Sequence, residues 1–166
     1  MTPDIQNQID AQKKSYNFKQ LANLANLILD TIKYTGENLG ELVADAQIAY
    51  QYYNKMNNVG KQLVKKYGPN QADGIDNYYH ALLQCKLAQI SPTSRDWGLR
   101  MGYGKEIYDY YKKKGNMPIQ TIISDSRKDL KNNLYGSNIG YNNPDKNCED
   151  MLDELRTENM RKENFR

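Results

Sequence analysis

The sequence predicts an all-α protein, a bundle of four or five helices with an irregular crossing segment. Apolar side chains recur at spacings of three and four along most of the chain, which is the period of an amphipathic helix. No segment alternates apolar and polar residues as a strand does. Gly, Pro, Asn and Ser gather between the periodic segments, where turns are expected. The 166 residues are enough to bury a core without metals or disulfides.

Residues 1–40 are expected to form an N-terminal helical extension. A helical pattern runs from Pro3 to about Tyr34. Its apolar residues form two stripes more than a quarter-turn apart at 100° per residue, so the halves contact different partners or the helix bends between them. The first stripe contains Ile5, Ile9 and Tyr16, and the second contains Leu21, Leu24, Ala25, Ile28 and Ile32.

Two further helices follow. The second is expected to begin at Leu42 and to end before “YGPN”, whose Gly and Pro are typical of the residues after a helix. The third is expected to begin at Asp73, a residue type that caps helices. The apolar face of the second helix is predicted as Leu42, Ala46, Ala49, Tyr50, Tyr53, Met56, Val64 and Tyr67, and that of the third as Ile75, Tyr79, Leu82, Leu83, Leu87 and Ile90.

The remaining chain predicts three more elements. A fourth helix spans about 95–114 after the capping sequence “SPTS”, and its Gly98, Gly102 and Gly104 indicate a close approach to a neighbouring helix. A short fifth helix spans 124–136 and stops at Gly136. Turn-forming residues fill 137–145, and a charged amphipathic helix, frayed at its end, begins at Cys148.

Charge and hydropathy narrow the possible partners. The formal net charge of +3 is spread along the chain, and the Lys run in “YDYYKKKG” fits cations at the C-terminal end of a helix, so nucleic acid is not an expected partner. No stretch of about eighteen apolar residues predicts a transmembrane helix. The N-terminus lacks the pattern of a secretory signal. The sequence therefore predicts a soluble protein that is cytoplasmic, exported by another route, or cut from a larger protein.

Cys85 and Cys148 are far apart, and the sequence has no CxxC pair and no Cys/His cluster. It therefore predicts no metal site. The glycines of “GLRMGYGKE” follow no strand and precede no GK[ST], so they do not form a phosphate loop, and no cofactor is expected. A disulfide between a helix and the tail is possible, but two free thiols are favoured.

Three separated motifs carry a family resemblance: “DNYYHALLQCKLAQ”, “GYGKEIYDYY” and “SDSRKDLKNNLYGSNIGYNNPD”. With a weaker match at “DAQIAYQYYNKMNNVG”, they make the chain from about Asp45 to Asp145 similar to serum amyloid A and to bacterial segments that resemble it at the ends of polymorphic secreted proteins. The resemblance implies a helical bundle over 41–145 whose C-terminal tail wraps back over the helices and is held by polar side chains. Residues 1–40 and 146–166 are then additions.

The candidate site centres on His80, the single histidine of the chain. Asp76 precedes it by four residues and shares its helical face. If the helices pack as the resemblance implies, Glu106 and Asp125 or Asp129 converge on this pair. A histidine flanked by carboxylates can act as a general base in hydrolysis. The favoured alternative is a structural network that holds the tail at 137–145, formed by Asp76, His80, Arg100, Glu106, Asp125, Asp129 and Asn133.

The leading functional prediction is a non-enzymatic helical bundle that binds a partner protein, a second copy of itself, or a lipid or membrane surface. Its binding residues are predicted in the first helix: Ile5, Ile9, Tyr16, Leu21, Leu24 and Ile28. One alternative is a bacterial secreted effector with hydrolase activity centred on His80 and the carboxylates around it. A second alternative is an immunity or adaptor protein that uses the acidic stretch 149–163 as its contact surface.

Overall fold

The computed structural model describes residues 39–72 and 74–166, which form helices and no strand, so the all-α prediction is confirmed. The predicted binding residues Ile5, Ile9, Tyr16, Leu21, Leu24 and Ile28, and the proposed cap Asp73, lie outside the described residues. The four long helices are α2 (Leu39–Tyr67), α3 (Ile75–Ile90), α4 (Pro92–Lys113) and α5 (Ile119–Asn142). The shorter elements are η1 (Pro69–Ala72), α6 (Cys148–Met151), η2 (Asp153–Leu155) and α7 (Glu158–Lys162).

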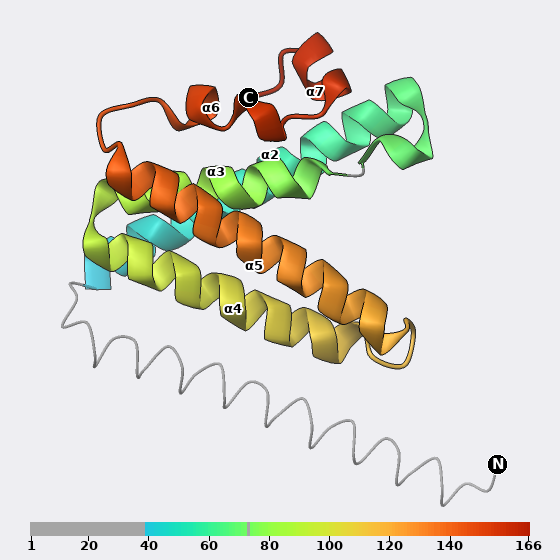
Figure 1. Cartoon of the computed structure of the whole chain (residues 1–166), viewed down its shortest axis with the longest axis horizontal. Coiled ribbons are helices and arrows are strands. Elements are labelled where there is room, and N and C mark those ends of the chain that lie inside the picture. The colour runs from blue at the N-terminus through green and yellow to red at the C-terminus, as the bar shows by residue number, and fades with distance from the viewer. Residues whose placement is uncertain (1–38, 73) are drawn as a thin grey trace, which may run out of the picture. The chain divides into compact units, whose positions relative to one another are not determined.

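Helix α3 is the centre of the described fold. It contacts α2, α4, α5 and α6, and it is buried around most of its circumference. Figure 1 shows α4 and α5 side by side, with the tail that carries α6 and α7 over α2 and α3. Polar side chains on the buried circumference of α3 therefore face other helices rather than water. No helix of the described part is long and apolar enough to cross a membrane.

Helix α2 begins at Leu39, three residues before the predicted start at Leu42, and ends at “YGPN” as predicted, but it buries a different face. Tyr50 and Tyr53, expected on the apolar face, are 68% and 57% exposed. The buried line contains Leu42, Val59 and Leu63, and it also contains the carboxylate of Asp45, which is 1% exposed. The predicted apolar face was wrong because Asp45 interrupts the buried apolar stripe in the sequence. Tyr50 and Tyr53, on the neighbouring face, have the spacing of an apolar stripe but are exposed.

Helix α4 begins within its predicted capping sequence “SPTS”, at Pro92, three residues before the predicted start at about 95. Ser91 is the N-cap and its Oγ accepts a hydrogen bond from the backbone N–H of Ser94 at 2.9 Å, while Pro92 occupies the first helical turn. The expected close approach at Gly98 and Gly102 is also present. A Cβ atom at either position would lie within 3 Å of a side-chain atom, Gln84 Oε1 for Gly98 and Asn133 Nδ2 for Gly102.

The prediction of a short fifth helix over 124–136 was wrong at both ends, because α5 begins at Ile119, with Pro118 as its N-cap, and does not stop at Gly136. Helix α5 continues to Asn142, so most of the segment 137–145 is helical rather than a turn. Gly136 and Gly140, four residues apart, face α3, where a Cβ atom on Gly136 would lie 1.9 Å from the carbonyl oxygen of Ala81. These glycines therefore allow the backbones of two helices to approach each other.

The tail is part of the core, and its cysteine is not free. Cys85 and Cys148 form a disulfide, so the preference for two free thiols was wrong. Leu152 and Met160 are 0% exposed and belong to the same apolar cluster as the buried residues of α2 and α3. The expected single charged helix from Cys148 is instead three short turns, which bend so that these apolar side chains reach the core.

Polar contacts hold the tail beside the disulfide. Gln89 Nε2 donates to the carbonyl oxygens of Asn143 and Lys146 at 2.8 and 2.7 Å. Lys86 forms an ion pair with Glu149 at 2.8 Å. Both donors lie on α3, where neither belongs to the network predicted to hold the tail.

Candidate functional site

The ring of His80 on α3 is held by two side chains of α5. His80 Nδ1 lies 3.1 Å from Asn133 Oδ1, and His80 Nε2 lies 3.3 Å from Asp129 Oδ2. Asp129 and Asn133 are four residues apart and therefore share one face of α5. Because both are at most 4% exposed, the imidazole is fixed by buried partners from one neighbouring helix.

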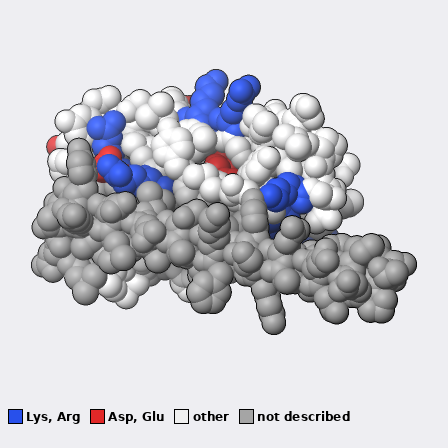
Figure 2. Space-filling view, turned by 90° about the horizontal axis from the view of Figure 1, so that it is seen from below, with Lys and Arg blue, Asp and Glu red and all other residues white. Residues whose placement is uncertain are grey.

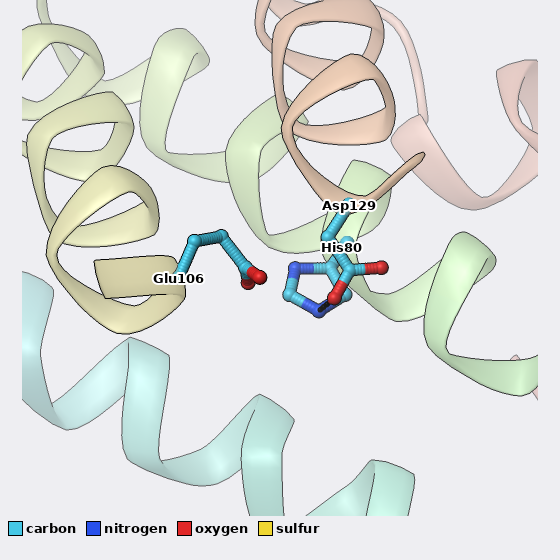
Figure 3. Close-up of side chains that lie close together, drawn as sticks. All are labelled: His80, Glu106 and Asp129. Atoms are coloured by element: carbon cyan, nitrogen blue, oxygen red, sulfur yellow. Dashed lines mark ion pairs between the residues drawn. The ribbon is translucent and has the colours of Figure 1, made fainter. Parts of the chain in front are cut away.

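Helix α4 places the carboxylate of Glu106 and the ammonium group of Lys105 near His80 and Asp129. Figure 3 shows the side chain of Glu106 directed toward His80 and Asp129. Lys105 Nζ lies 2.8 Å from Glu106 Oε1, 3.1 Å from Asp109 Oδ2 and 3.5 Å from Asp129 Oδ2. Burial would lower the pKa of Lys105, but the hydrogen bond to Glu106 and the nearby carboxylates outweigh it and raise that pKa. Lys105 therefore stays charged, between acidic side chains of α4 and α5.

Asp129 remains ionised despite its burial. Burial raises its pKa, but the hydrogen bond to His80 and the charges of His80, Lys105 and Lys128 outweigh this effect and lower the pKa below its ordinary value. The Oδ1 atom of Asp129 has no hydrogen-bond partner among the described residues. A buried carboxylate with one free oxygen is therefore at the centre of the site.

A pocket of about 220 Å³ opens beside this cluster between α2, α3 and α4. Aromatic and aliphatic side chains form its walls, including Tyr53 and Trp97, while His80, Gln84, Lys105 and Asn133 supply its polar groups. The remaining lining residues are Ala49, Tyr52, Met56, Tyr79, Leu83, Leu87, Gly98, Met101 and Gly102.

Two amide side chains that line the pocket have unused hydrogen-bonding capacity. Gln84 Nε2 donates to the carbonyl oxygen of Gly98 at 2.8 Å, but Gln84 Oε1 accepts from no described group. Asn133 Nδ2 likewise has no acceptor in the described part. Gln84 is 3% exposed and Asn133 is 2% exposed. A free acceptor and a free donor, both buried, are unusual in a folded protein and need an explanation.

The structure brings together only part of the predicted network. His80, Glu106, Asp129 and Asn133 converge, whereas Asp76 pairs with Lys128 at 3.0 Å rather than with His80. Asp125 pairs with Lys113 and Lys128, and Arg100 pairs with Asp96 one turn away on α4. The described contacts of this network connect α3, α4 and α5 to one another, whereas the tail contacts given above come from Gln89 and Lys86. The prediction also missed Gln84, Lys105 and the pocket.

At neutral pH, Asp129→Asn is expected to lower the free energy of unfolding by about 2 kcal/mol, because His80 and Lys105 lose a charged acceptor. Since the folded-state pKa of Asp129 is lowered, its contribution is present above the ordinary value of 3.8 and is lost as the pH falls through the folded-state pKa. The difference between the wild-type and variant proteins in urea denaturation should therefore shrink as the pH falls below 3.8. If the difference in stability between the two proteins stays constant as the pH falls below 3.8, the lowered pKa of Asp129 is wrong.

Comparisons with protein-family models, with curated proteins and with solved structures find no significant match for this chain. The similarity to serum amyloid A therefore stays a prediction from the sequence motifs.

Proposed function

We propose that the described domain is a non-enzymatic binding protein whose ligand is a small molecule with an apolar body and an uncharged hydrogen-bonding end. The observation that carries the proposal is the pair of unpartnered, buried amide groups, Gln84 Oε1 and Asn133 Nδ2, on two residues that line a mainly apolar pocket. Ligand sites commonly combine apolar walls with a few placed polar groups. A carboxamide or a hydroxyl group could both donate to Gln84 and accept from Asn133.

The size and charge of the site narrow the ligand further. At about 220 Å³ the pocket is smaller than a typical drug-sized site, which favours a short chain or a single ring. The ammonium of Lys105 is already balanced by Glu106, Asp109 and Asp129, so an anionic end group would meet neighbouring carboxylates. An uncharged end group avoids this repulsion.

The surface around the pocket fits a small ligand better than a nucleic acid. Tyr53 and Met101, on either side of the pocket, are large apolar residues that remain 57% and 39% exposed. On the described part of the face drawn in Figure 2, Lys and Arg lie in separate groups, with uncharged and some acidic residues between them. Nucleic-acid surfaces instead cluster basic side chains along one track.

The disulfide supports a site of action outside the reducing cytoplasm, as expected for an exported domain.

The test uses two probes of equal length, hexanamide and hexanoate. Trp97, the single tryptophan of the chain, lines the pocket, so its fluorescence reports binding directly. Hexanamide should change the emission saturably, and hexanoate should bind about tenfold more weakly or not at all, because it cannot donate to Gln84. Gln84→Met, which keeps the size of the side chain but removes the acceptor, should weaken hexanamide binding by about tenfold.

Two tyrosines of α2 provide the matched control for the probe experiment. Tyr53 lines the pocket, whereas Tyr50, which is equally large and also exposed, does not. Tyr53→Ala should weaken hexanamide binding and Tyr50→Ala should leave it unchanged. The proposal fails if hexanamide leaves Trp97 emission unchanged, or if the two alanine variants weaken binding equally.

Hydrolysis is a second candidate function, favoured by the contact of His80 with Asp129 beside a pocket. A histidine oriented by a carboxylate can act as a general base. A toxic hydrolase should stop growth of the cells that express it, and His80→Gln should restore growth while the melting temperature stays near that of the wild-type protein. Normal growth with the wild-type chain would favour the binding proposal instead.

A further inference from the structure

The ligating atoms of His80, Glu106 and Asp129 lie within 4.8 Å of one another, one from each of α3, α4 and α5. Figure 3 shows the three side chains converging. Two atoms bound to one zinc ion at about 2.1 Å in tetrahedral geometry are about 3.4 Å apart. The contact of 3.3 Å between His80 Nε2 and Asp129 Oδ2 already meets this spacing. Rotation of the Glu106 carboxylate can bring its oxygen to the same spacing from the other two ligating atoms.

The surrounding charges favour an added cation. An ion-pair network among the described residues links five carboxylates with three ammonium groups, which leaves two negative charges in excess when the imidazole is neutral, as it is in a metal ligand. The carboxylates belong to Asp76, Glu106, Asp109, Asp125 and Asp129, and the ammonium groups to Lys105, Lys113 and Lys128.

Two features beyond the acidic cluster indicate a metal ligand set. Asn133 Oδ1 faces His80 Nδ1, so that nitrogen carries a proton and directs Nε2 toward the carboxylates. Metal-binding histidines commonly donate their second ring nitrogen in this way. Asp129 is 4% exposed, and its Oδ1 has no partner in the described part of the chain. The ion would bind Oδ2, where it replaces the contacts with His80 and Lys105, and Oδ1 remains available as a second oxygen of the same carboxylate.

We propose that His80 Nε2, Glu106 and Asp129 bind one divalent transition-metal ion of the zinc class. The ion replaces the proton between His80 Nε2 and Asp129, and it displaces the ammonium of Lys105 from Glu106. Lys105 can move because its side chain is 40% exposed and Asp109 offers another partner at 3.1 Å. One nitrogen and two carboxylate ligands suit Zn²⁺ better than Mg²⁺, which binds to oxygen and water.

The sequence predicted no metal site because its cysteines form no cluster. The three ligands proposed here form no local motif, because they are more than twenty residues apart in the sequence. They meet only when α3, α4 and α5 pack together. The proposed ion does not depend on the pocket ligand, so each proposal can fail without the other.

The chain offers a clean spectroscopic test. His80 is its single histidine, and both of its cysteines are in the disulfide, so imidazole coordination of Zn²⁺ can arise only at this site. One equivalent of Zn²⁺ should shift the two imidazole C–H resonances of His80 in the proton NMR spectrum, and calorimetry should give one site per chain. An equal concentration of Mg²⁺ should leave these resonances in place. Unmoved His80 resonances with Zn²⁺ would overturn the proposal.

Variants with opposite expected effects extend the test. Asp129→Asn and Glu106→Gln should each abolish the single calorimetric site, whereas Lys105→Met should tighten Zn²⁺ binding by roughly tenfold because a competing cation is removed. Asp150→Asn, at an exposed carboxylate paired with Arg166, is the matched control and should bind as the wild-type protein does. If Asp129→Asn does not fold, loss of Zn²⁺ binding in Glu106→Gln together with tighter binding in Lys105→Met still tests the proposed site. Unchanged affinity in Lys105→Met, or equal loss in Asp150→Asn, would contradict the site.

Discussion

Gly136→Ala is expected to lower the free energy of unfolding by about 3 kcal/mol or more, one of the largest effects of any single substitution in the described domain. The added Cβ atom would lie 1.9 Å from the carbonyl oxygen of Ala81 and 2.6 Å from its Cα atom. Both belong to the backbone of α3, so no side-chain rotation relieves the overlap. Helices α3 and α5 would have to separate, which would also move His80 away from Asp129 and Asn133.

Gly60→Ala is the matched control for this substitution. Gly60 is also inside a helix, but the nearest atom to an added Cβ there is Ile75 Cδ1 at 3.9 Å, an ordinary contact. The gain in helix propensity should then stabilise the protein by up to about 1 kcal/mol. Urea denaturation of the two variants measures both effects. If Gly136→Ala is no less stable than the wild-type protein, the close approach of α3 and α5 is wrong.

Removing the disulfide is expected to have an effect of similar size. In the double variant Cys85→Ala, Cys148→Ala, the unfolded chain loses a cross-link between residues 63 positions apart, which by loop entropy corresponds to about 4 kcal/mol. Both cysteines are fully buried in the apolar cluster that contains Leu152 and Met160. The tail should therefore also become accessible to protease cleavage before the helical bundle unfolds.

Reduction of the wild-type protein provides the control. Protein folded under oxidising conditions should lose stability when a phosphine reductant is added, down to the level of the double variant. The double variant should not respond to the reductant. A wild-type denaturation midpoint that is the same with and without reductant would contradict the disulfide.

The sequence predicted the fold class and several helix limits because these depend on local features. The Ser91–Pro92 start of α4 and the “YGPN” end of α2 are examples, since capping and turn residues act within a few positions. The end of α5 was missed at Gly136, where the same residue type serves a long-range purpose. Whether glycine stops a helix or lets another helix approach depends on the neighbour, which a single sequence does not show.

The disulfide and the path of the tail were missed for the same reason. Cys85 and Cys148 meet only after the chain has turned back over α3, a contact that no local pattern encodes. Likewise, the residues after Cys148 predicted one charged amphipathic helix with a frayed end, whereas the chain forms short turns through which Leu152 and Met160 fill the core. Apolar residues spaced for several short turns resemble a frayed amphipathic helix in sequence.

The candidate site was predicted in part. The motifs of α3, α4 and α5 singled out His80, Glu106, Asp129 and Asn133, and these four converge. Gln84 was missed because glutamine on a buried helical face carries no motif. The role proposed for the set changed because α5 is longer than expected, so that the segment which the polar groups were thought to hold is itself helical.

Side-chain amide resonances of the protein during a hexanamide titration test the central proposal most directly. The Asn133 and Gln84 NH₂ signals should shift together as the probe saturates the pocket. Gln89, whose NH₂ group already donates to two tail carbonyl oxygens, serves as an internal reference and should not move. If the Asn133 and Gln84 signals remain in place while Gln89 or exposed amides respond, the pocket between α2, α3 and α4 is not the binding site.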